Sequence, residues 1–243
     1  MFDPFKDFEQ VGYLRNRYGE KDRQIVQELE HELFRANLID AQAYLAKRRA
    51  ISYDDFLKVH ELLFLAFYPW AGQDRAMTAP DIAVSKGNIM FGHPFEAKRA
   101  VDYGLQIARD SKELRKRSGE VLGLFAFGHP FLDGNGRTML VIHTELCHRA
   151  GFCIEWHRTA KYDYLAALSA EIVTPGKGIL DNYLNQFIGA SQERGLWGGM
   201  ISDLSGLDGQ GGDTVEGEYS DESVSQKYRE FEAQRGYRAE PGV

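Results

Sequence analysis

The stretch of sequence that decides the interpretation runs from His129 to Arg137 and reads His-Pro-Phe-Leu-Asp-Gly-Asn-Gly-Arg. It follows an almost wholly apolar segment, Val121 to Phe127, which predicts a buried helix at the centre of the molecule. It places an imidazole just past that helix, a carboxylate four residues later at Asp133, and Gly-Asn-Gly where the next helix opens. Glycines let backbone N–H groups point into one concavity, and a helix N-terminus adds positive potential. The stretch therefore predicts an anion cradle between two helices.

The side chains around this cradle suit the transfer of a phosphate-containing group to an alcohol. Arg137 can bind a phosphate through two hydrogen bonds. Asp133 is a natural ligand for Mg²⁺, which prefers one or two carboxylates together with phosphate oxygens. His129 can take the proton from an attacking hydroxyl. Gly-Asn-Gly alone would indicate only a common turn, so the interpretation depends on the whole string.

The nine-residue string resembles the signature of the Fic (filamentation induced by cAMP) family, and it matches that signature at every fixed position. Residues 70–75, Trp-Ala-Gly-Gln-Asp-Arg, are similar to a second element of the family. Residues 85–91 lie where the family carries a β-hairpin flap, and a Gly-Asn pair between apolar residues independently favours a hairpin there. The resemblance covers roughly residues 52–188 and implies an all-α Fic fold, a helical bundle with a small β-hairpin flap.

The resemblance implies a role for each matched residue of this stretch. His129 would be the general base, Asp133 would hold the Mg²⁺ that bridges the donor phosphates, and Arg137 would neutralise charge on the leaving pyrophosphate. The phosphates would be cradled by the backbone N–H groups of three consecutive residues, Gly134, Asn135 and Gly136. Phe131 is apolar and would anchor the stretch in the core.

Most Fic proteins move AMP from ATP to a Tyr, Thr or Ser side chain. The resemblance therefore implies a protein adenylyltransferase with ATP as its co-substrate and with a partner protein that exposes a hydroxyl side chain. An extended segment of that target would dock on the flap by strand pairing, which demands little target sequence. The implied docking position is near three consecutive residues, Ile89, Met90 and Phe91.

Two departures from the family pattern bear on the donor and on regulation. Many adenylylating relatives carry a second arginine where this chain has Leu140. That position lies on the same helix face as Arg137, so the missing cation would have faced the same phosphates. The family's autoinhibitory motif, [Ser/Thr]-x-x-x-Glu-[Gly/Asn], has its nearest match at Thr214 to Glu218, which a tyrosine follows. We therefore discount that match and expect any regulation to come from a separate small antitoxin-like protein or from another mechanism.

Two alternatives to AMP transfer stay open. The same site would suit another donor, such as UTP or a CDP-alcohol, or it would bind a nucleotide or a regulator without turnover. Gly136 favours nucleotidyl transfer, because a phosphorylating relative carries a lysine there that would fill the cradle. The presence of His129 argues against a binding-only module, which needs no general base.

Composition excludes several other classes of protein. The net charge of −7 argues against a general binder of nucleic-acid backbones, and the apolar runs are too short to span a bilayer. The chain shows no basic-then-apolar leader. Its two cysteines, Cys147 and Cys153, form no CxxC pair, which argues against a zinc site or a disulfide framework and favours a reducing compartment. We expect a cytoplasmic protein, or a toxin or effector exported into another cell.

Periodicity and composition divide the chain into three predicted parts. Residues 1–50 are an N-terminal helical arm with apolar residues at helical spacing, namely Ile25, Leu29, Leu33 and Leu38. Residues 51–195 are the Fic catalytic core, whose last helix is expected over 179–190. Residues 196–243 are a flexible Gly/acidic tail, with a linker over 198–217 and a possible short helix over 220–235.

Overall fold

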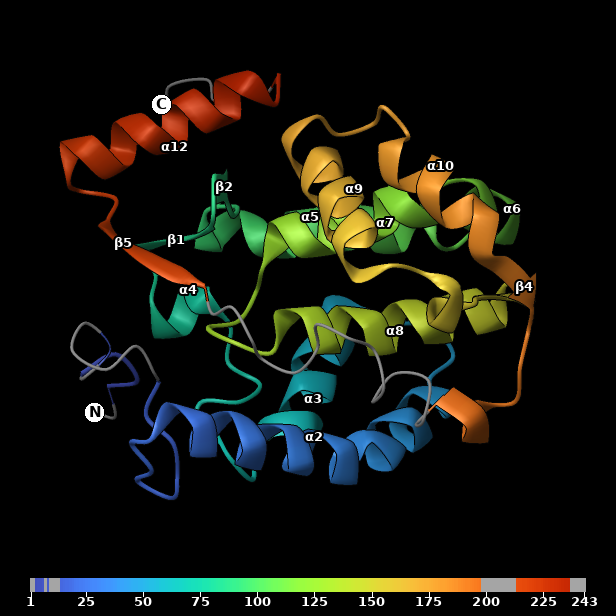
Figure 1. Ribbon diagram of the computed structural model, residues 1–243, viewed down its shortest axis with the longest axis horizontal. Coiled ribbons are helices and arrows are strands. Elements are labelled where there is room, and N and C mark those ends of the chain that lie inside the picture. The colour runs from blue at the N-terminus through green and yellow to red at the C-terminus, as the bar shows by residue number, and fades with distance from the viewer. Residues whose placement is uncertain (1–2, 7, 9–13, 198–212, 237–243) are drawn as a thin grey trace.

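The computed structural model describes residues 3–6, 8, 14–197 and 213–236 (Figure 1). Its α-helices are α2 (Arg23–Ala46), α3 (Tyr53–Phe64), α4 (Arg75–Thr78), α5 (Pro94–Ile107), α6 (Ser111–Lys116), α7 (Ser118–Gly128), α8 (Asn135–Arg149), α9 (Lys161–Val173), α10 (Ile179–Leu184) and α12 (Glu222–Gln234). Short 3-10 helices lie at Trp156–Arg158, Asn185–Phe187 and Arg194–Leu196. The strands are β1 (Ile82–Lys86), β2 (Ile89–Met90), β3 (Phe152–Ile154), β4 (Ile188–Ala190) and β5 (Thr214–Glu218). The predicted helical bundle with a small β-hairpin is confirmed.

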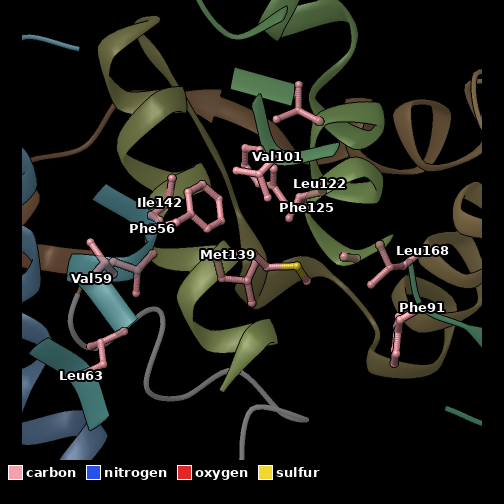
Figure 2. Close-up of a cluster of buried hydrophobic side chains, with 14 of the residues drawn as sticks. Phe56, Val59, Leu63, Phe91, Val101, Leu122, Phe125, Met139, Ile142 and Leu168 are labelled. Atoms are coloured by element: carbon pink, nitrogen blue, oxygen red, sulfur yellow. The ribbon is translucent and has the colours of Figure 1, made fainter. Parts of the chain in front are cut away.

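Helix α7 forms the centre of the bundle, as its apolar sequence predicts. Leu122 and Phe125 are at most 1% exposed, and Figure 2 shows both beside Val101 of α5 in a cluster of buried hydrophobic side chains. Gly119 lets α10 approach closely, because a Cβ there would lie 2.4 Å from the backbone N of Asp181. The Asp181 carboxylate accepts a hydrogen bond from Gly119 N–H (2.7 Å), so one helix caps the N-terminus of the other.

Helix α8 lies between two groups of helices. In Figure 1, α2 and α3 lie on one side of α8, and α5, α7 and α9 lie on the other. Its residues Leu140, Val141 and Ile142 are at most 2% exposed. Because α7 ends and α8 begins at the same turn of the chain, residues 129–134 are held between two buried helices.

Two small antiparallel sheets are present among the described residues. Strands β1 and β2 form the expected hairpin, in which Lys86 pairs with Ile89 across a turn where Gly87 has a φ of 60°. Strand β5 pairs with the other edge of β1, so the strand order is β2-β1-β5. Strands β3 and β4 form the second sheet.

The buried face of α2 differs from the predicted one. Ile25 is 42% exposed, and Leu29 and Leu33 are only partly buried. The positions that the helix buries are Val26, Glu30, Phe34, Leu38, Ala41, Gln42 and Leu45. The apolar stripe is turned by one residue over the first half of the helix, and as a consequence an acidic residue faces the interior.

The predicted helix over 179–190 is wrong at its C-terminal end. Helix α10 stops at Leu184, and residues 188–190 form β4, which pairs with β3. The buried run Phe152–Ile154 needs hydrogen-bond partners for its backbone groups, and β4 supplies them. Long-range pairing therefore overrides a helical continuation that local propensity allows.

The described part of the C-terminal region packs on the bundle. Helix α12 falls inside the range 220–235, and the residues of its predicted stripe, Val224, Tyr228 and Phe231, are buried. Residues 198–212 of the predicted linker lie outside the described residues. Within the part of the chain that the structure describes, no helix combines the length and the apolar character needed to cross a bilayer.

Candidate active site

His129 caps the C-terminus of α7 in a left-handed backbone conformation. Its φ is 43°, and no other described non-glycine residue has a positive φ. Such a conformation is costly for a residue with a Cβ. The His129 N–H donates to the Phe125 carbonyl (3.2 Å), and the His129 carbonyl accepts from Nε of Arg75 (2.8 Å). These bonds hold the imidazole clear of the helix that precedes it.

Arg75, at the start of α4, connects this loop to the flap. Its side chain is fully buried, and its own backbone N–H donates to the carbonyl of Pro130 (2.7 Å). Its Nη2 donates to the carbonyl of Gly92, just after the flap (2.7 Å). Burial lowers the pKa of Arg75. One guanidinium therefore fixes the flap relative to His129, and the sequence indicated this residue only through the resemblance of 70–75.

The interior of the loop is closed by side chains that do not face a ligand. Phe131 is 1% exposed and stacks on His60 with 3.7 Å between ring centroids. The Asn135 side chain bonds the backbone of Phe131 twice, accepting from its N–H (2.8 Å) and donating to its carbonyl (2.7 Å). His60 accepts from Gly72 N–H at Nδ1 (2.9 Å), so its Nε2 donates to the carbonyl of Asp133 (3.0 Å). Burial lowers the pKa of His60 to about 3, which keeps it neutral.

Gly134 is the position where only a glycine fits. Its φ is 76°, and a Cβ there would lie 2.6 Å from the Phe64 ring and 3.1 Å from Nε2 of His60. Directly after it α8 begins, and the first N–H groups of a helix have no partner within the helix. The backbone of Gly134, Asn135 and Gly136 therefore lies at a helix N-terminus, an arrangement that favours an anion.

Arg137 lies in the first turn of α8 and is buried against aromatic rings and a carboxylate. Its Nη2 donates to Glu30 of α2 (2.5 Å), and its guanidinium carbon lies 4.7 Å from the centroid of the Phe64 ring. Its Nη1 is buried without a hydrogen-bond partner among the described residues. Burial raises the pKa of Glu30 to about 7, although the charge of Arg137 acts in the opposite direction. A buried donor without a partner suits a phosphate oxygen.

Asp133 is the exposed member of the site. Its side chain is 43% exposed, and its Oδ1 accepts from Gly134 N–H (2.5 Å) and lies 3.5 Å from Nη2 of Arg137. Within the described residues, no group of three or more His, Cys, Asp or Glu side chains converges to hold a metal. A single open carboxylate beside an anion cradle fits Mg²⁺ that takes its remaining ligands from phosphate oxygens and water.

The imidazole of His129 is covered on two sides by segments distant in the sequence. The ring stacks on Phe91, with 3.6 Å between centroids and an interplanar angle of 8°. Its Nε2 lies 2.7 Å from Oδ2 of Asp213, the residue before β5. Burial lowers the pKa of His129, although Asp213 acts in the opposite direction. Burial alone would raise the pKa of Asp213, but the neighbouring His129 makes the net shift downward. The pair is therefore a carboxylate that accepts from the Nε2–H of a neutral imidazole.

The structure brings the predicted site residues together unequally. His129, Asp133 and Arg137 lie on one turn between α7 and α8, as their spacing requires. Ile89 and Met90 form β2 and pair only with β1 among the described strands, whereas Phe91 reaches the catalytic imidazole.

Sequence reasoning missed Glu30 and Asp213. Each comes from a segment that is distant in the chain, and nothing in the nine-residue string refers to it. One signal for Glu30 existed, because it stands four residues after Val26 and four before Phe34 on the buried stripe of α2. Asp213 precedes a short, mostly polar strand and gave no comparable signal.

Comparison with known proteins agrees with the motif. Residues 50–147 match the model of the Fic/DOC family. The chain is 30% identical over 181 residues to the protein adenylyltransferase VbhT of Bartonella schoenbuchensis, a match that covers 68% of this chain and 35% of that protein. It is 31% identical over 168 residues to the probable protein adenylyltransferase y4lH of Sinorhizobium fredii, which covers 64% of this chain and 81% of that protein. The chain thus spans about a third of the first relative and about four fifths of the second.

Solved structures share the fold at low sequence identity. The N-terminal Fic domain of Bep8, a VirB-translocated effector of Bartonella sp. 1-1C, superposes with a TM-score of 0.64 at 13% identity, covering 81% of this chain and 98% of that one. BepC of Bartonella tribocorum, a structure with bound AMPPNP, has a TM-score of 0.62 at 16% identity and covers 76% and 96%. These similarities confirm the predicted Fic fold.

Proposed function

Because this chain belongs to the Fic/DOC family, we propose that it is a nucleotidyltransferase that moves AMP from ATP to a Tyr, Thr or Ser hydroxyl of a target protein. One observation carries the proposal. A buried imidazole, an open carboxylate and a guanidinium with a free buried donor lie on one turn at a helix N-terminus. The names of the two curated relatives support the same chemistry.

The proposed reaction assigns one task to each side chain. The target oxygen forms a bond to the α-phosphorus, the bond from that phosphorus to the pyrophosphate oxygen breaks, and Nε2 of His129 takes the hydroxyl proton. Arg137 and the N–H groups of residues 134–136 stabilise charge on the leaving pyrophosphate. Asp133 would hold Mg²⁺, which supplies further charge neutralisation at the donor phosphates.

The identity of the donor is the part of the proposal with least support. Leu140, which stands where many relatives carry a second arginine, is 2% exposed and belongs to the core of α8. Arg137 therefore faces the phosphates without a neighbouring cation from the next turn of that helix. Weaker binding of the far end of a triphosphate would leave room for a donor other than ATP, such as UTP or a CDP-alcohol.

A binding-only module is the second candidate function, and two contacts favour it. Glu30 is paired with Arg137 and Asp213 with His129, so both functional side chains already have acidic partners from this chain. If these contacts persisted with nucleotide present, the site would bind without turnover. Labelling experiments separate this candidate from the enzyme, because binding alone leaves no covalent product.

The test is transfer of label from α-³²P-ATP to proteins of a cell lysate by the full chain. We expect labelled proteins with the native sequence or, more strongly, with Asp213→Ala. His129→Ala should lower labelling by about 10²–10⁴-fold. His157→Ala, which removes an exposed imidazole outside the site, is the matched control and should not change labelling.

Competition with unlabelled UTP and a CDP-alcohol identifies the donor. The two buried free cysteines fit a reducing compartment, so lysates of the producing bacterium and of a eukaryotic host are both suitable. Labelling that His129→Ala leaves undiminished would refute the assigned base, and nucleotide binding without any labelled product would favour the binding-only module.

A further inference from the structure

The edge of the flap that lies next to His129 is already occupied by the chain itself. Strand β5 pairs antiparallel with β1, with Ile82 opposite Glu218, Val84 opposite Val215 and Ser85 opposite Thr214. Figure 1 shows β5, near the C-terminus, lying alongside the early strand β1. The side chains of β5 are exposed or half-buried, so backbone bonds rather than side-chain pockets hold the strand. This is the mode of docking that an extended peptide uses on a sheet edge.

The residue before this strand reaches the catalytic base. Asp213 accepts from Nε2 of His129 at 2.7 Å, and the two side chains are only 17% and 7% exposed. An attacking hydroxyl must come within hydrogen-bond distance of the same imidazole to lose its proton. A carboxylate at this position has no hydroxyl proton to give up, and it keeps the hydrogen on Nε2. Thr214, the next residue, instead pairs with Ser85 in the sheet.

Helix α12 holds the strand in place. Tyr228 OH accepts from His93 N–H (3.0 Å) at the end of the flap, and Lys227 forms an ion pair with Glu216 of β5 (2.7 Å). Arg235 lies over the ring of Phe127, two residues before His129, at 3.5 Å from its centroid, and it donates to the carbonyl of Ile172. Covalent attachment gives such a segment a high effective concentration at the site, so modest contacts are sufficient for occupancy.

We propose that the C-terminal segment (residues 213–236) occupies the place of the target in this chain, with Asp213 standing where the acceptor hydroxyl of the target must stand. The proposal rests on the transferase function proposed above. It places target docking at the β1 edge, antiparallel to Ile82–Ser85, with the modified residue immediately before the first paired residue. The target must displace the C-terminal segment, so the native chain is held in a low-activity state.

The test compares labelling of target proteins by the native chain, Asp213→Ala and Phe231→Asp, with Glu230→Ala as the control. Phe231 is buried in the α12 interface, and Glu230 is an exposed neighbour on the same helix. Asp213→Ala frees Nε2 of His129, and Phe231→Asp undocks α12. Each should raise labelling by at least about tenfold, because the competent state is otherwise a minor population. Only Phe231→Asp should also speed hydrogen exchange of the Ile82–Ser85 amides.

The acceptor register is tested by giving the segment a hydroxyl. In Asp213→Thr and Asp213→Tyr, the new oxygen forms the bond to the α-phosphorus, pyrophosphate leaves, and His129 takes the proton. We expect AMP on residue 213, at a rate independent of protein concentration, and none on Thr214. Combining either substitution with His129→Ala should abolish the modification.

The two proposals fail in distinguishable ways. Labelling of lysate proteins that neither Asp213→Ala nor Phe231→Asp increases would overturn the role of the C-terminal segment and leave the transferase function standing. If amide exchange rises in Phe231→Asp but no variant labels any protein with any donor, the transferase function fails, and the role of the segment fails with it.

Discussion

The two sides of the site are closed by acidic residues from opposite ends of the chain, and they are built differently. On the nucleotide side, Glu30 lies within a 24-residue helix and bonds Arg137, with side-chain exposures of 3% and 5%. On the target side, Asp213 precedes a five-residue edge strand, and its carboxylate is 17% exposed. One carboxylate is part of the core, and the other belongs to an attachment that can be exchanged. Stability should therefore respond to changes on the nucleotide side, and access to His129 to changes on the target side.

The largest expected effect is on the nucleotide side. Arg137→Met leaves Glu30 buried without its cation, and breaking a buried ion pair by removal of one partner costs about 3–5 kcal/mol. Denaturant unfolding should show this loss in the free energy of unfolding. The double variant Glu30→Gln/Arg137→Met removes both charges and should recover most of it. A single variant as stable as the native chain would show that the pair is not buried in solution.

Gly134→Ala should follow in size. A Cβ there meets Phe64 at 2.6 Å and the residue keeps a φ of 76°, so we expect a loss of about 2–4 kcal/mol from overpacking and backbone strain together. Gly151→Ala is the matched control, because Gly151 has a φ of 81° and nothing within 4 Å. Its cost should be about 1–2 kcal/mol, from strain alone. Equal losses in the two variants would show that the loop relaxes around the added methyl group.

Glu30 should give the nucleotide side a pH dependence. Its pKa rises from 4.5 to about 7 on folding, so between these pH values the folded chain holds a proton that the unfolded chain has lost. The stabilisation is complete below pH 4.5 and is lost as the pH rises through 7. From pH 5 to pH 8, the native chain should lose about 1–3 kcal/mol more than Glu30→Gln does. Parallel stability curves for the two proteins would contradict the raised pKa.

The smallest stability effect should be on the target side. Asp213→Asn keeps the size of the side chain at an edge strand, so the free energy of unfolding should change by less than about 0.5 kcal/mol. The pKa of His129 should fall further, because burial already lowers it and the carboxylate that opposes this is gone. Titration of the His129 ring by NMR measures the shift. An unchanged pKa would mean that Asp213 does not contact the imidazole in solution.

The catalytic turn was predictable because its residues are consecutive. Chain connectivity keeps His129 and Arg137 near each other whatever the rest of the fold does, and an apolar helix before them fixes the turn in the core. The hairpin was predictable from Gly87-Asn88 for the same local reason. Chemistry carried by one contiguous segment is therefore visible in the sequence.

The two acidic contacts were not predictable because they depend on long-range pairing. Assigning Ile25 to the buried face of α2 hid the fact that Glu30 stands on the true stripe, between Val26 and Phe34. Asp213 contacts a residue 84 positions earlier in the chain. The strand after it, Thr-Val-Glu-Gly-Glu, is polar and contains glycine, so only the open edge of β1 makes it a strand.

The most direct test of the account follows the two ends of the nucleotide. Asp213→Ala is incubated with a lysate and with ATP labelled at either the α- or the γ-phosphate, and His129→Ala/Asp213→Ala serves as the control. We predict that label from the α-phosphate becomes attached to protein hydroxyls, that label from the γ-phosphate is released in pyrophosphate, and that the control attaches neither. Attachment of the γ-label, or α-labelling that survives loss of His129, would contradict the account.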